Sequence, residues 1–112
     1  MNATIYHNPK CGTSRNVLQI LRDAGIEPKV VEYLKTPLSR KEISDLAWKL
    51  GDTSALLRTK EPLAAGLNLK GAGDDAILAA IAEHPILFNR PVVVTDKGAK
   101  VCRPSEIVRE LI

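Results

Sequence analysis

Apolar residues recur along the chain with two different periods, and each change of period marks a change of element. A run of β-forming residues at positions 4–6 predicts a first strand. From Val17 to Ala24, apolar residues recur at helical spacing, and Gly25 stands where the cap of a helix C-terminus belongs. Positions 30–33 predict a second strand, and the helix between the two strands predicts that they are parallel.

The next segment of the chain predicts a helix with well-marked ends. Ser39 and Glu42 have the spacing of a capping box, which places the helix N-terminus at Ser39. The apolar positions that follow share one helical face as far as Gly51, which closes the helix. Trp48 lies on this helix, and we expect it to serve in packing.

Positions 54–84 predict further short helices. Asp74 or Asp75 is placed to cap the N-terminus of the last of them, and Pro85 ends it. The middle of the chain is therefore expected to be helical throughout.

The C-terminal part predicts a hairpin and a final helix. Positions 92–95 and 99–102 read as strands, and positions 96–98 between them carry a tight-turn signal. A helix is expected from position 104, with its apolar residues turned inward. The order strand–helix–strand, helices, strand–strand–helix is the thioredoxin-like layout. It is an α/β fold with a small mixed sheet and an inserted helical segment, expected as one domain over residues 1–112.

Composition narrows the classes of function. The chain has 112 residues, of which 45% are hydrophobic, enough for one compact core. Its net charge of +3 is carried by scattered basic residues, and aromatic residues make up only 4%, so a nucleic-acid interface is not expected. No apolar run is long enough to span a membrane, and the N-terminus lacks the pattern of a secretory signal. We therefore expect a cytoplasmic protein.

The two cysteines, Cys11 and Cys102, carry the candidate chemistry. Neither belongs to a Cys-x-x-Cys pair, and only two histidines are present, so a zinc site is not expected. Cys11 falls between a predicted strand and a predicted helix, where unpaired N–H groups and the helix dipole favour a thiolate and can bind an oxyanion. Lys10 and Arg15 could add to this effect. A buried structural cysteine is the alternative, but the polar flanks favour an exposed, reactive thiol.

Two familiar thiol architectures are missing around Cys11. The resolving cysteine of a dithiol site would stand at position 14, which is Ser14. The arginine of a phosphatase-type loop would stand at position 17, which is Val17. A resolving thiol must come from Cys102 or from another molecule.

Several motifs together resemble those of the glutaredoxin-coupled arsenate reductase family. Positions 7–16, His-Asn-Pro-Lys-Cys-Gly-Thr-Ser-Arg-Asn, resemble its active-site loop. The resemblance continues in the family's order through Leu56-Leu57-Arg58 with Glu61-Pro62, His84-Pro85-Ile86-Leu87, Asn89-Arg90-Pro91 and Cys102-Arg103-Pro104-Ser105-Glu106. These pieces span nearly the whole chain, which makes the resemblance specific.

The resemblance implies which residues do the chemistry. Cys11 would attack arsenate, and Arg58, Arg90 and Arg103 would bind its oxygens. Guanidinium groups suit this task because they bind tetrahedral oxyanions through paired hydrogen bonds. Arg58 falls in the loosest of the matching segments.

Four further residues would support the loop. The resemblance implies a cis peptide bond before Pro91. His7 would tune the thiol, or would be a polar residue at the end of a strand facing solvent. Ser14 and Arg15 would hold the loop through hydrogen bonds, with Ser14 better placed to contact the sulfur. Cys102 is expected in a buried strand position.

The family's reaction implies external thiols and no bound cofactor. Glutathione, a co-substrate, would add to the arsenic of the cysteine adduct, and glutaredoxin would resolve the mixed species as arsenite leaves. No flavin or nicotinamide fingerprint is present, so these thiols must supply the electrons. Longer family members carry a further C-terminal tail, so we expect differences in stability, assembly or docking rather than in chemistry.

Two alternatives stay open on the sequence alone. Cys11 could act on another oxyanion or on a mixed disulfide, because the fold does not determine the substrate. Alternatively, the protein could be a regulatory module that binds a partner. Regulators of this fold resemble redox switches with a Cys-x-x-Cys pair, which this chain lacks.

Overall fold

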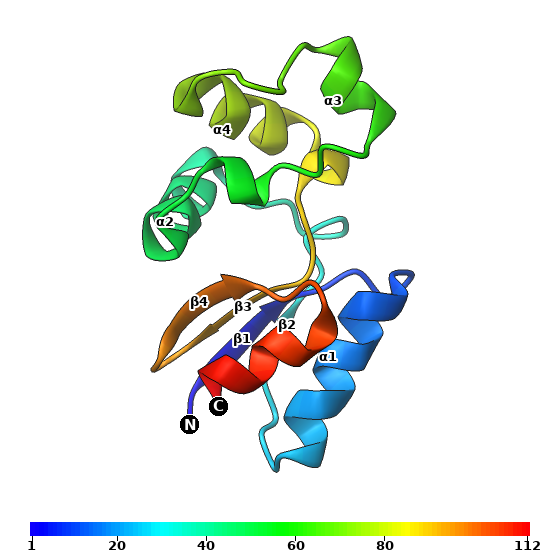
Figure 1. Ribbon diagram of the computed structural model, residues 1–112, viewed down its shortest axis with the longest axis vertical. Coiled ribbons are helices and arrows are strands. Elements are labelled where there is room, and N and C mark those ends of the chain that lie inside the picture. The colour runs from blue at the N-terminus through cyan, green and yellow to red at the C-terminus, as the bar shows by residue number, and fades with distance from the viewer. The chain divides into compact units, whose positions relative to one another are not determined.

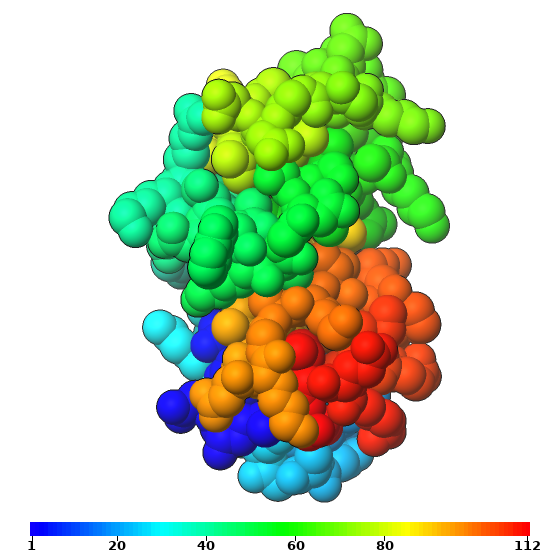
Figure 2. Space-filling model, turned by 60° about the vertical axis from the view of Figure 1, so that its left-hand side comes forward, coloured from blue at the N-terminus to red at the C-terminus, as the bar shows by residue number.

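The computed structural model describes all residues, 1–112, and the chain divides into two compact units (Figure 1 and Figure 2). Unit 1 comprises Met1–Thr36 and Arg90–Ile112, and unit 2 comprises Pro37–Asn89. Unit 2 is thus inserted in sequence between the second and third strands of unit 1, where the sequence predicted a helical insertion. That the whole chain folds as one domain stays a prediction.

Unit 1 is built on a four-stranded mixed sheet, as predicted. Its strands are β1 (Ala3–Tyr6), β2 (Lys29–Val31), β3 (Val92–Thr95) and β4 (Gly98–Val101), in the order β2-β1-β3-β4. β1 is parallel to β2 and antiparallel to β3, and β3 and β4 form an antiparallel hairpin. The Arg90–Pro91 bond before β3 is cis, which confirms the expectation for Pro91, and the Arg103–Pro104 bond after β4 is also cis.

Two helices of unit 1 pack on one face of this sheet. They are α1 (Gly12–Asp23) and η3 (Ser105–Leu111), and η3 is a 3₁₀ helix. The alternation of side chains along a strand turns Ile5 and Val93 toward this face. The buried core of the unit consists of Ile5, Val17, Leu21, Val93, Cys102, Val108 and Leu111. It ties α1, which carries the candidate nucleophile at its start, firmly to the sheet.

Unit 2 is helical, as predicted. Its elements are α2 (Arg40–Leu50), η1 (Ser54–Leu56), α3 (Pro62–Gly66), α4 (Asp74–Glu83) and η2 (Pro85–Leu87). The capping box at Ser39 and Glu42 is present, and Gly51 caps the C-terminus of α2 with a left-handed φ of 74°. α2 and α4 pack against each other (Figure 1).

Two expectations about unit 2 need correction. The N-cap of α4 is Gly73, so Asp74 and Asp75 lie within the first helical turn. The helix dipole stabilises carboxylates at these positions as well. Trp48 was expected in packing, but its side chain is 84% exposed. The helical face of α2 that packs inward is filled by Ile43, Leu46 and Ala47, and Trp48 lies outside it. No helix of either unit is long and apolar enough to cross a lipid bilayer.

Candidate active site

Cys11 is the N-cap residue of α1 and stands at the end of the loop that follows β1. The loop is closed by the N–H of Cys11, which donates to the carbonyl of Asn8 at 3.0 Å. The first N–H groups of a helix have no partner within the helix, so those of Gly12 and Thr13 can hold an anion beside the sulfur, whereas that of Ser14 interacts with the sulfur itself. Cys11 is partly exposed, whereas Cys102 is buried. An anion and a nucleophile can therefore meet at this position.

A buried polar network holds the loop from below. The Ser14 hydroxyl is completely buried, lies 2.6 Å from His7 Nδ1 and accepts a hydrogen bond from the N–H of Asn8 at 3.1 Å. The side chain of Asn8 in turn accepts the N–H of Lys10 at 3.0 Å, which forms a local turn. Asn8 was not among the residues expected to support the loop, although an asparagine before a proline is a known turn signal.

His7 is a buried part of this network. Only 5% of the residue is exposed, so the reading of His7 as a solvent-facing residue at a strand end is wrong. Burial lowers the pKa of His7, with Arg22 and Arg15 acting in the same direction and Glu32 opposing them. The imidazole is therefore neutral near pH 7, and it can share a hydrogen bond with the Ser14 hydroxyl without adding charge to the loop.

Ser14 and Arg15 both support the loop, in different ways. The hydroxyl of Ser14 is directed to His7 and Asn8, and it is the backbone N–H of Ser14 that interacts with the Cys11 sulfur. Arg15 folds back and donates from Nη1 to the carbonyl of Pro9 at 2.9 Å. Both residues thus fix the backbone around the sulfur.

The hairpin of β3 and β4 brings two arginines together. Its pairing continues beyond the strands, because the N–H of Cys102 donates to the carbonyl of Pro91 at 2.9 Å. The next residues outward, Arg90 and Arg103, lie opposite each other, and Arg103 Nη1 donates to the carbonyl of Arg90 at 3.0 Å. The same nitrogen lies 3.6 Å from the sulfur of Cys11.

The register of the sheet explains why this end of the hairpin meets the cysteine loop. β1 is antiparallel to β3, with Tyr6 paired with Val92. The end of β1 that leads to Cys11 therefore lies beside the start of β3, which Arg90 precedes. This pairing, together with that of β3 and β4, brings residues 79 and 92 positions away from Cys11 in sequence to the cysteine loop.

These neighbours make Cys11 acidic. Burial by itself raises the pKa of the thiol, but the backbone N–H of Ser14 and the guanidinium groups of Arg90 and Arg103 outweigh burial and lower the pKa to about 7. A large share of the thiol is then ionised at neutral pH, which is what a nucleophile requires. The sequence predicted that Lys10 and Arg15 would help. The main cationic contributions instead come from the two arginines of the hairpin.

Cys102 has the opposite environment. It lies just after β4 within the core of unit 1, which confirms the expected buried position. Burial is the main cause that raises its pKa to about 12. A protonated thiol enclosed in the core is a poor nucleophile, so Cys102 is a packing residue.

Arg58, the third predicted arginine, belongs to unit 2. Its N–H donates to the carbonyl of Leu87 at 2.8 Å, and its Nε lies 4.0 Å from the carboxylate of Glu61. The side chains of this pair are 22% and 23% exposed. That Arg58 binds the same anion as Arg90 and Arg103 stays a prediction.

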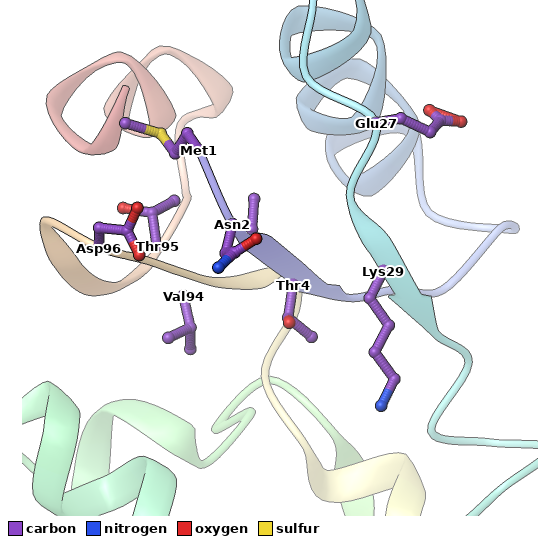
Figure 3. Close-up of a pocket in the computed structure, with 9 residues that line it drawn as sticks. Met1, Asn2, Thr4, Glu27, Lys29, Val94, Thr95 and Asp96 are labelled. Atoms are coloured by element: carbon purple, nitrogen blue, oxygen red, sulfur yellow. The ribbon is translucent and has the colours of Figure 1, made fainter.

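One hollow of unit 1 lies outside the candidate site. It has a volume of about 390 Å³ and is lined by Met1, Asn2, Ala3, Thr4, Glu27, Lys29, Val94, Thr95 and Asp96 (Figure 3). None of the predicted site residues lines it. The chain also holds no group of three or more His, Cys, Asp or Glu side chains that could bind a metal ion.

Comparisons with known proteins agree with this geometry. The family model described as the ArsC family matches residues 6–111. An arsenate reductase of Rhizobium meliloti (strain 1021) is 50% identical over 100% of this chain and 82% of its own length. An arsenate reductase of Escherichia coli is 50% identical over 99% of this chain and 81% of its own length.

Solved structures support the same relationship. The structure of an arsenate reductase from Vibrio cholerae superimposes with a TM-score of 0.94 at 45% sequence identity, covering 100% of this chain and 98% of that one. A neighbour from Bacteroides fragilis, described as related to the ArsC family, has a TM-score of 0.78 at 20% identity and supports the fold alone. The thioredoxin-like architecture predicted from the order of elements is confirmed.

Proposed function

The chain belongs to the ArsC family, and from that premise we propose that it is an arsenate reductase with Cys11 as its nucleophile. The observation that carries the assignment of the nucleophile is the position of its sulfur at the start of α1, 3.6 Å from Arg103 Nη1. The names of the relatives supply the substrate, arsenate. The geometry supplies a reason why this cysteine can attack such an anion.

The first step is the attack of the Cys11 thiolate on arsenic. A sulfur–arsenic bond forms, and one arsenate oxygen takes up protons and leaves as water. Two anions repel each other, so the positive charges of Arg90 and Arg103 lower the barrier to this encounter. Their guanidinium groups bind the oxygens that remain, with Arg58 proposed as a third ligand. The N–H groups at the start of α1 add further hydrogen bonds.

The later steps need two external thiols. Glutathione adds to the arsenic of the Cys11 adduct as a second arsenic oxygen leaves as water, and the glutaredoxin thiolate then attacks the glutathione sulfur. The electron pair of the bond between the glutathione sulfur and arsenic stays on arsenic, which becomes As(III). Glutathione and glutaredoxin form a mixed disulfide. Hydrolysis of the bond to Cys11 releases arsenite and restores the thiol.

The character of Cys102 supports an external resolving thiol. Its sulfur is enclosed in the core, and its pKa of about 12 keeps it protonated. We propose a cytoplasmic location on chemical grounds, because this reaction requires reduced thiols, which glutathione and thioredoxin systems maintain there.

Arsenate-dependent oxidation of NADPH, coupled through glutathione reductase, glutathione and glutaredoxin, tests the proposal. We expect turnover in the wild type and in Cys102→Ser, and none in Cys11→Ser. Loss in Cys102→Ser with folding intact would refute the external resolving thiol. A wild type that forms no arsenite with several glutaredoxins would refute the proposed activity and favour another thiol substrate or a partner-binding role.

A further inference from the structure

Trp48 is the most exposed of the large hydrophobic residues and the only tryptophan of the chain. Its 84% exposure contrasts with 43% for Leu67 and 46% for Ile86 in the same unit. A tryptophan left in water carries a large apolar surface and an indole N–H that a partner can use. Tryptophan is also among the residues that most often dominate the energy of protein interfaces.

A hollow of about 650 Å³ lies beside this side chain, between α2 and α4. This volume falls within the range of about 300–1,000 Å³ that is common for binding sites. The residues that line it are Ser44, Ala47, Trp48, Gly51, Asp52, Thr53, Asp74, Asp75 and Leu78. Ala47 and Leu78 are buried and supply an apolar base, whereas the three aspartates are exposed.

The charge of this hollow is opposite to that of the chain. Its three ionisable lining residues are all carboxylates, Asp52, Asp74 and Asp75, while the chain as a whole carries +3. Asp75 has a cation nearby, because Arg40 Nη2 lies 3.4 Å away, but both side chains of this pair are more than half exposed. Such an exposed pair is weak and exchanges readily with another cation.

We propose that this hollow is a docking site for a basic segment of a partner protein, with an arginine stacked on Trp48. A guanidinium binds the face of an indole and forms paired hydrogen bonds with carboxylates at the same time. Asp52 and Asp74 line the same hollow as Trp48 and supply carboxylates for the second kind of contact. An apolar neighbour of that arginine would pack on Ala47 and Leu78. None of the residues that line the hollow is among those proposed to bind arsenate, so the inference does not depend on the proposed function.

Trp48 itself provides the test, because its fluorescence has no background from another tryptophan. The probe is a blocked peptide, acetyl-Ala-Leu-Arg-Leu-Arg-Ala-amide, titrated into the full chain at low salt. We expect a saturable change with a Kd of about 1 mM or tighter. Affinity should fall several-fold between low and physiological salt, because exposed charges are screened. The same peptide with glutamate in place of arginine should not bind.

Calorimetry then compares variants of the hollow with matched controls. Trp48→Ala and the double variant Asp52→Asn, Asp74→Asn should each weaken binding of the arginine peptide at least tenfold. Leu67→Ala and Glu83→Gln change an exposed apolar and an exposed acidic residue elsewhere in unit 2 and should leave binding unchanged. Trp48→Ala should melt at the wild-type temperature, since its ring is exposed.

Four results would overturn the proposal. They are absence of saturable binding, equal binding of the glutamate peptide, undiminished binding by Trp48→Ala, and equally tight binding of free arginine methyl ester. The last would indicate a site for a small cation. Sedimentation of the protein alone provides a fifth check, because a dimer that Trp48→Ala abolishes would assign the hollow to a second copy of this chain.

Discussion

Replacing Arg103 with methionine should raise the pKa of the Cys11 thiol from about 7 to about 8. The guanidinium Nη1 lies 3.6 Å from the sulfur, and two unit charges at about 4 Å interact by about 1 kcal/mol in water and about 4 kcal/mol near a protein surface. Arg103 is exposed, so the lower end of this range applies. About 1.4 kcal/mol corresponds to one pKa unit.

The rate of alkylation by iodoacetamide, measured as a function of pH, reports this pKa directly. At pH 7 the ionised fraction should fall from about one half to about one tenth, and the alkylation rate should fall with it. Cys102 does not interfere, because it is buried. Arg103→Lys should recover most of the effect, since it keeps the charge, whereas Arg109→Met removes an exposed arginine from η3 and should change nothing.

An unchanged midpoint in Arg103→Met would refute this reasoning. It would mean that the backbone N–H of Ser14 and the side chain of Arg90 alone hold the thiolate. A midpoint that moves equally in Arg103→Met and in Arg109→Met would instead indicate a general effect of net charge rather than a local contact.

Three other properties should follow from the structure. Ellman's reagent should titrate one thiol in the native protein and two in denaturant, because Cys102 is enclosed in the core; two rapidly reacting native thiols would contradict its burial. Burial lowers the pKa of His7, so the unfolded state binds its proton more readily, and stability should fall as pH drops below about 6.5. Urea midpoints between pH 7 and pH 5 should therefore decline less in His7→Gln than in the wild type, and equal declines would argue against a buried neutral imidazole. Ser39→Ala removes the hydroxyl that accepts the N–H of Glu42 and should lower the free energy of unfolding by about 1 kcal/mol in urea titrations, with Ser44→Ala as a control on the exposed face of the same helix.

Local chemistry made the ends of several elements predictable. The Ser39 hydroxyl and the Glu42 carboxylate satisfy N–H groups within one turn, so their spacing alone defined the start of α2. Gly51 adopts a left-handed conformation that other residues resist, so its place after the helical pattern marked the end. The prediction that Asp74 or Asp75 caps α4 was wrong, because a carboxylate is favourable both as the N-cap of a helix and inside its first turn.

Trp48 shows where a pattern of apolar positions stops being informative. Its helix has enough small and branched apolar residues to fill the inner face, and the sequence does not say which member of the pattern is left outside. Only the packing of α2 against α4 decides this. The same packing forms the hollow beside the exposed ring.

In the candidate site, the place of Cys11 at the start of a helix was predictable from the sequence, because the strand, loop and helix that position it are contiguous. It could not show that Arg90 and Arg103, rather than Lys10 and Arg15, supply most of the charge around the sulfur. That outcome depends on which strands pair and in which register, and strand pairing is a long-range property of the whole sheet. The charges around the Cys11 sulfur therefore follow from strand pairing, whereas its place at the start of α1 follows from neighbouring residues of the chain.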